Sequence, residues 1–119
     1  MIIPFVPKGC TPGYWKQEHH FDSWFVYSPG DIFDTVFGVI SSFGSSFTLL
    51  DALQQGGGGE IALGRHAVAA LLNSTNPDVS YAYSSAQVIA IVQNAYATGH
   101  YNAAKNLLEA QNELVCPLD

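Results

Sequence analysis

Side chains that could hold a divalent metal gather in one short segment of the chain, Glu18-His-His-Phe-Asp22. His19, His20 and Asp22 are weak candidates for such a site, because imidazole nitrogens and carboxylate oxygens are ordinary zinc ligands. Adjacent histidines normally point apart, and a third ligand such as His66 would have to arrive from a distant helix. We therefore favour a solvated loop that binds neither a metal nor another cofactor.

Nucleophilic chemistry has even less support in the sequence. None of the serines stands in the Gly-x-Ser-x-Gly pattern that exposes a nucleophile on a sharp turn. The two cysteines, Cys10 and Cys116, cannot act as nucleophiles if they are bonded to each other. We therefore predict that the protein is not an enzyme.

The two cysteines stand at opposite borders of the part of the chain that should fold. A disulfide between Cys10 and Cys116 would close a loop of about 100 residues and stabilise the fold by about 4 to 5 kcal/mol in the chain-entropy model. Such a bond persists in an oxidising compartment, which predicts an extracellular location. Two free thiols are the alternative, and zinc is disfavoured because the sequence has no Cys-x-x-Cys pair.

Six aromatic residues crowd the stretch from Tyr14 to Tyr27. Trp15, Trp24 and Tyr27 could stack on sugar rings, as aromatic platforms do in carbohydrate-binding modules. The alternative, which we favour, is that these rings cover the helical core, because a small set of helices needs large groups to cover it.

Arg65 and His66 fall early in an apolar helix, where an unpaired charge is costly. We expect Arg65 to donate hydrogen bonds to loop carbonyls or to a carboxylate such as Asp51. His66 should bond to the aromatic first half of the chain, and Asn112 should be a buried amide that ties the final turn to the opening loop. An anion or ligand site at Arg65 and His66 is the alternative.

The helix that carries these two residues must lie in the middle of the fold. Apolar residues lie almost all round the segment 60–72, which indicates a helix covered by its neighbours. It should end in Asn73-Ser-Thr-Asn-Pro77, because Pro77 pushes the residue before it out of the helical region. Asn73 also begins an N-glycosylation sequence in what should be an exposed loop, so it is either a glycan acceptor or the helix cap.

Two further helices should follow as an antiparallel hairpin. Ser84 or Ser85 begins the first of them with a capping box, and Gly99 ends it. The second helix should cover about 101–114, and the connection through Gly99 and His100 is short enough to force antiparallel packing. The residues that this last helix should bury are Tyr101, Ala104, Leu107, Leu108 and Leu114.

The first half of the chain, residues 10–47, is rich in aromatic residues, Gly, Ser and Pro and has little periodicity. Short helices are predicted at 31–37 and 48–55, and no strand pattern competes with them. We therefore predict an all-α fold: a small single-domain helical bundle over 10–118, with an aromatic, loop-rich N-terminal half.

Residues 1–9 should form an extended arm or linker, because Pro4 and Pro7 prevent a helix there. The stretch lacks the features of a signal peptide, so we expect that a leader was removed upstream or that this is an excised module. A disordered tail is the alternative to docking. The large apolar residues that favour docking are Ile2, Ile3, Phe5 and Val6.

The composition excludes two classes of partner. The 119 residues contain 4 Lys and Arg against 10 Asp and Glu, for a net charge of −6. The four cations are scattered, so we expect no nucleic-acid partner, since phosphate binding needs clustered cations. No apolar run approaches the roughly 18 residues of a membrane span, so we expect no membrane-spanning helix.

Several motifs together resemble a known module. They are Gly9-Cys-Thr-Pro-Gly-Tyr-Trp-Lys16, Leu49-Leu-Asp-Ala-Leu53, Gly56-Gly-Gly-Gly59, Arg65-His-Ala-Val-Ala-Ala-Leu-Leu-Asn73 and Cys116-Pro-Leu118. From about Gly9 to Leu118 the chain resembles the "TPGYWKN" family of secreted and surface proteins of bacteria and archaea. The resemblance implies an extracellular module, often found beside other surface domains, with no established catalytic role. Gln17 stands where the family usually has Asn, and Glu18-His-His20 replaces its more usual His-Pro segment.

These observations lead to three functions in order of preference. The first is a secreted, non-catalytic structural or interaction module that assembles with itself or with other surface proteins into a fibre or surface layer. In that case the arm would pack into a groove of the next copy, a contact that propagates without closing. The second is a carbohydrate-binding module with glycans as partners, and the third is a metal-dependent hydrolase.

Overall fold

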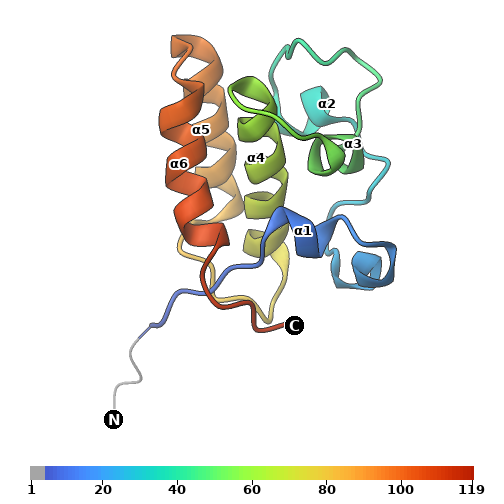
Figure 1. Cartoon of the computed structure of the whole chain (residues 1–119), viewed down its shortest axis with the longest axis vertical. Coiled ribbons are helices and arrows are strands. Elements are labelled where there is room, and N and C mark those ends of the chain that lie inside the picture. Colours follow the sequence, from blue (N-terminus) through green and yellow to red (C-terminus); the bar gives the residue numbers. More distant parts are fainter. Residues whose placement is uncertain (1–4) are drawn as a thin grey trace.

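The computed structural model describes residues 5–119, and the regular elements of this part are all helices. They are α1 Pro12–Trp15, the 3-10 helix η1 Glu18–Ser23, α2 Phe33–Phe37, α3 Leu49–Gln54, α4 Glu60–Thr75, α5 Ser85–Thr98 and α6 Tyr101–Asn112. In Figure 1, α4 stands in the middle, with α5 and α6 on one side and the short helices on the other. The predicted all-α fold is confirmed.

The central position of α4 explains its apolar composition. Neighbours cover it on both sides, and 11 of its 16 residues are buried, so it has no broad polar face. The helix ends at Thr75, inside the segment 73–77 where its end was predicted, and the backbone of Asn76 is extended. Its last turn is supported by the hydroxyls of Ser74 and Thr75, which donate to the Leu71 carbonyl at 2.6 and 3.2 Å, and Pro77 follows.

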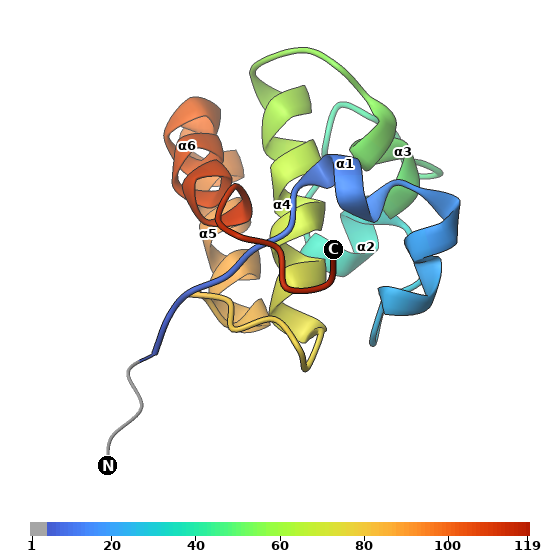
Figure 2. The same ribbon diagram turned by 60° about the horizontal axis from the view of Figure 1, so that its bottom comes forward.

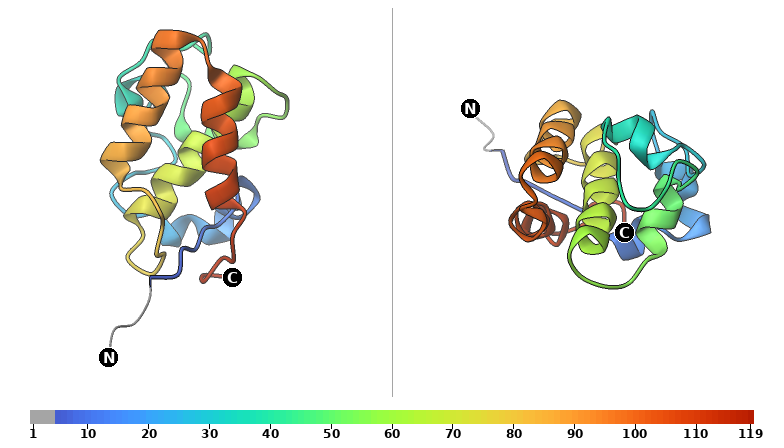
Figure 3. Two further views of the ribbon diagram at one scale, coloured as in Figure 1. Left: turned by 90° about the vertical axis from the view of Figure 1, so that its left-hand side faces the viewer. Right: turned by 90° about the horizontal axis from the view of Figure 1, so that it is seen from above.

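The helices α5 and α6 form the predicted antiparallel hairpin, which Figure 3 shows from its outer side. The backbone N–H of Gln87 donates to the Ser84 hydroxyl at 3.2 Å, and the Ser84 N–H donates to the Gln87 side chain at 2.8 Å. This is the expected capping box, with Ser84 as the N-cap. Gly99 ends α5 with φ of +78°, a conformation that glycine adopts without strain.

The burial predicted for α6 is only partly correct. Ala104, Leu108 and Asn112 follow one another at intervals of four residues, and they are the buried face of the helix. Leu107 is 44% exposed, because its side chain lines an open groove between α5 and α6. Leu114 is 37% exposed, because the helix ends before it.

The N-terminal half consists of short helices joined by loops. Thr48 and Asp51 form a capping box at the start of α3, within the range 48–55 where a short helix was predicted. The helix α1 was not predicted, although it has a recognisable start: the Thr11 side chain caps it and Pro12 occupies its first turn.

The disulfide between Cys10 and Cys116 is present and joins residues 106 apart in the sequence, with their Cα atoms 4.5 Å apart. Beside it, the Gly9 N–H donates to the Val115 carbonyl at 3.2 Å. A Cβ atom on Gly9 would overlap the Gln111 carbonyl, so only glycine allows this close passage. Figure 2 shows the N-terminal segment passing the C-terminal segment at this end of the molecule.

The described part of the arm is bonded to the body at Lys8 and exposed at Phe5 and Val6. The Lys8 N–H donates to the Ser80 carbonyl at 2.9 Å, whereas Phe5 and Val6 are 65% and 55% exposed. Ile2 and Ile3 lie outside the described residues. Within residues 5–119, no helix combines the length and the apolar character that crossing a bilayer requires.

Candidate functional site

Asn73 lies at the centre of a buried hydrogen-bond network that begins at the disulfide. Its Oδ1 atom accepts hydrogen bonds from the Cys10 N–H at 2.9 Å and from Trp15 Nε1 at 3.2 Å. Its Nδ2 atom donates to the Cys10 carbonyl at 2.9 Å and to Asn112 Oδ1 at 3.1 Å. The side chain therefore uses its two donors and both lone pairs of its oxygen inside the protein.

The predicted glycosylation of Asn73 is wrong for the folded protein. The residue is fully buried within α4 and does not lie in an exposed loop. An N-linked glycan replaces one hydrogen of Nδ2, and both of these hydrogens are already donated within the core. The alternative of a helix cap is also wrong, because the helix ends beyond this residue.

Asn112 continues the network from α6. Its Oδ1 atom also accepts from the Tyr81 hydroxyl at 2.6 Å, and its Nδ2 atom donates to the His66 carbonyl at 3.0 Å. The predicted buried amide is therefore present. It reaches the opening loop through Asn73, which bonds to both Asn112 and Cys10.

His66 bonds to α6 and not to the aromatic first half of the chain, so its predicted partners are wrong. Its Nδ1 atom is 3.2 Å from the donor Asn112 Nδ2, so it accepts, and the proton lies on Nε2. Nε2 is 3.4 Å from a Glu109 carboxylate oxygen. Burial lowers the pKa of His66 to about 4 against the opposing attraction of Glu109, so the ring is neutral at pH 7.

Arg65 has the structural role that one alternative predicted. Its guanidinium donates to the carbonyls of Gln55 and Gly57 at 2.8 and 3.2 Å, which holds the glycine-rich loop before α4. Asp51 is not its partner, because the Asp51 carboxylate accepts from the N–H of Thr48.

The two tryptophans belong to the core. Trp15 is fully buried and Trp24 is 9% exposed. Trp24 Nε1 donates to the Trp15 carbonyl at 3.1 Å, which fixes the Trp24 ring to the Trp15 backbone. A stacking platform built on these tryptophans is therefore wrong, since a sugar ring needs an open aromatic face. Tyr27 is half-buried against the same core.

The histidine-rich segment gains no third ligand for a metal. The His20 ring stacks on Tyr14 with centroids 3.9 Å apart, and His19 lies 4.1 Å from His20. His66 is engaged with Asn112 and Glu109 in the core. Across residues 5–119, no three His, Cys, Asp or Glu side chains are placed to hold one ion.

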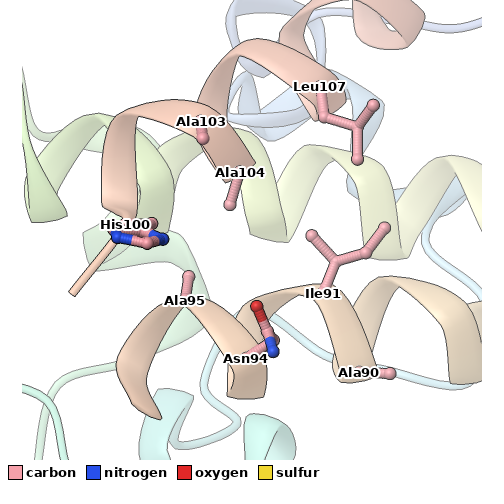
Figure 4. Close-up of a pocket in the computed structure, with 8 residues that line it drawn as sticks. All are labelled: Ala90, Ile91, Asn94, Ala95, His100, Ala103, Ala104 and Leu107. Carbon is pink, nitrogen blue, oxygen red and sulfur yellow. The ribbon is translucent and has the colours of Figure 1, made fainter. Parts of the chain in front are cut away.

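An open groove of about 410 Å³ lies between α5 and α6 at the surface of the molecule (Figure 4). Four alanines make it shallow and apolar, and Ile91 and Leu107 stand along it. Asn94 and His100 add polar atoms, as the close-up shows. The lining residues are Ala90, Ile91, Asn94, Ala95, His100, Ala103, Ala104 and Leu107.

The groove was not predicted from the sequence. Leu107 was assigned to the core because it falls on the apolar side of α6. A signal for the groove was present, because small residues face each other on the two helices. They are Ala90 and Ala95 on α5 and Ala103 and Ala104 on α6, and larger side chains at these positions would fill the groove.

A second, wider hollow of about 730 Å³ lies by the α5–α6 turn, between the Gly38–Ile40 loop, Gln93, Tyr96, Ala97 and Tyr101. Ile40 is 94% exposed beside it. The Tyr96 hydroxyl donates to Glu60 at 2.7 Å. Partial burial favours the neutral acid at Glu60, but hydrogen bonds from Ser42 and Tyr96 outweigh it and lower the pKa of Glu60. These groups stabilise the fold, and they offer no paired nucleophile and base.

No family model matches this chain, and neither the curated proteins nor the solved structures give a match.

Proposed function

We propose that this chain is a secreted, non-catalytic structural module that assembles with copies of itself through its N-terminal arm. The observation that carries the proposal is the state of the arm, in which Phe5 and Val6 are 65% and 55% exposed while Lys8 and Gly9 are bonded to the body. Exposed apolar groups on an anchored segment are a usual sign of a protein interaction site.

The chemistry of the arm suits docking on a protein surface. Residues 1–7 contain no charged side chain, and Ile2 and Ile3 add to the apolar content of Phe5 and Val6. Pro4 and Pro7 have fixed φ angles and disfavour the helical region at the residues before them, which lowers the entropy that the arm loses when it binds.

An extracellular location is supported by the disulfide between Cys10 and Cys116, because such bonds persist in oxidising compartments. The resemblance of the Gly9–Lys16 and Arg65–Asn73 motifs to the "TPGYWKN" family favours the same location. A fibre or surface layer is the assembly that we propose there.

The use of the polar residues supports a structural role over a catalytic one. Asn73, Asn112 and His66 bond to one another and to the backbone in the core, and Arg65 holds a loop. Groups committed in this way stabilise the native state, because leaving any of them unpaired in the core is costly.

Deletion of residues 2–7 tests the proposal. The full chain should form oligomers whose mass rises with concentration in light scattering, and the deleted chain should be a monomer with an unchanged helical circular dichroism spectrum. A finer comparison uses Phe5→Ser, with Phe25→Ser as its control, since Phe25 is 44% exposed outside the arm. A wild type that is monomeric at every concentration, or oligomers that survive the deletion, would refute the proposal.

A further inference from the structure

The groove between α5 and α6 matches the arm in length. It extends along α5 from Ala90 to the turn at His100, which is about 15 Å at 1.5 Å per helical residue. Residues 2–7 in a polyproline-like conformation span about 19 Å at 3.1 Å per residue. One arm therefore fills the groove from end to end.

The groove also matches the arm in chemistry. Its lining has alanines, Ile91 and Leu107 but no carboxylate, ammonium or guanidinium group, and residues 1–7 likewise have no charged side chain. Asn94 and His100 can exchange hydrogen bonds with the peptide groups of an extended segment (Figure 4). Pro4 and Pro7 have no N–H to leave unpaired in such a complex.

The positions of the two features favour a contact between different copies. The arm leaves the body beside Ser80, at the end opposite the α5–α6 turn, as the left view of Figure 3 shows. In this structure Phe5 and Val6 are open to solvent and do not lie in the groove of their own chain. A donor at one end and an acceptor on another face form a head-to-tail contact, which continues from copy to copy.

We infer that the α5–α6 groove is the acceptor for residues 2–7 of a second copy of this chain, so that copies join head to tail. The inference rests on the proposed function, because it names the surface that the arm binds. Leu107 and Ile91 would cover the arm's apolar side chains, and this role explains why a leucine is left 44% exposed beside a row of alanines.

The test closes the groove and leaves the arm intact. Ala103 is exposed and lines the groove, so Ala103→Arg places a long charged side chain in the path of the arm. Asn102→Arg is the matched control, because Asn102 is the neighbouring exposed residue of α6 and does not line the groove. Ala90→Arg closes the groove from α5 and serves as a second variant if the first is destabilised.

The first variant should be monomeric in light scattering, and the control should assemble like the wild type. A mixture then tests the direction of the contact. Ala103→Arg has a free arm but no groove, and the double variant Phe5→Ser/Val6→Ser has a groove but no working arm. Each should be monomeric alone, and an equimolar mixture should give dimers and nothing larger.

The outcomes separate the two proposals. If both groove variants assemble like the wild type while the arm variant is monomeric, the groove is not the acceptor but the proposed self-assembly stands. A mixture that stays monomeric also overturns the groove as acceptor. If the wild type itself is monomeric, whether its arm is free, folds onto its own groove or binds a different protein, both proposals fail.

Discussion

The disulfide end of the molecule and the α5–α6 groove use similar side chains in opposite ways. At the disulfide end, Asn73 and Asn112 are fully buried and hydrogen-bonded on every side. In the groove, Asn94 and His100 are exposed among alanines. The first arrangement completes its bonds within the chain and specifies the fold. The second arrangement leaves polar and apolar groups exposed to solvent, where a binding partner can contact them.

The largest expected effect on stability follows from breaking the disulfide between Cys10 and Cys116. Reduction followed by alkylation should lower the free energy of unfolding by about 4 to 5 kcal/mol, since the unfolded chain regains the freedom of a loop of about 100 residues. Urea unfolding followed by circular dichroism measures the change. The groove variant Ala103→Arg should keep the stability of the oxidised wild type. Equal urea midpoints for the oxidised and the reduced protein would contradict the stabilising role of the disulfide.

The next largest effect should come from Asn73→Ala. It removes the partners of the Cys10 peptide groups and of Trp15 Nε1 in the core, and we expect a loss of about 3 kcal/mol. The matched change in the groove, Asn94→Ala, should alter stability by less than about 0.5 kcal/mol, because that side chain is exposed. Similar losses of stability for the two variants would show that the disulfide end and the groove do not differ in how their asparagines contribute to the fold.

Lowering the pH should reduce the free energy of unfolding, because His66 at the disulfide end becomes protonated more readily in the unfolded chain than in the folded one. The folded pKa, about 4, lies below the ordinary value of 6.5, so the unfolded state binds the extra proton between these values. The stabilisation from His66 is therefore complete above pH 6.5 and is lost as the pH falls through about 4, by about 3 kcal/mol in total.

Urea midpoints at several pH values, compared between the wild type and His66→Gln, isolate this contribution. NMR titration of the ring gives the pKa directly. The prediction is wrong if the His66 ring titrates near 6.5 and both proteins show the same pH dependence of stability. Burial would then not disfavour the protonated ring.

The smallest effect on stability is expected at the groove itself. Leu107→Ser should cost less than about 1 kcal/mol, because the side chain is already 44% exposed, yet it should weaken assembly in light scattering. Its neighbour Leu108 is fully buried, and Leu108→Ala should cost about 2 to 5 kcal/mol. If the two substitutions destabilise equally, Leu107 belongs to the core and the groove is not an open surface.

The helices could be predicted where their signals are local. Thr48 and Ser84 each cap the helix that follows, and Gly99 closes α5, because capping depends on residues three or four apart. The start of α1 at Thr11-Pro12 has the same kind of signal and could have been recognised. The disulfide could be predicted because the sequence contains only two cysteines.

The pairing of polar groups could not be predicted in the same way. The asparagine that resembled a glycan acceptor, Asn73, meets Asn112 across 39 residues, and His66 meets Asn112 across 46. These contacts depend on which faces of α4 and α6 come together, and no local pattern specifies that. The groove has the same origin, since the exposure of Leu107 depends on how closely α5 approaches α6.

The bridge also determines how the molecule responds to mechanical tension. A pull applied to the chain before Cys10 and after Cys116 passes through one covalent bond, and the helices between them bear none of it. Stretched in this direction, the oxidised protein would be inextensible, and reduction would release the 106-residue span as slack.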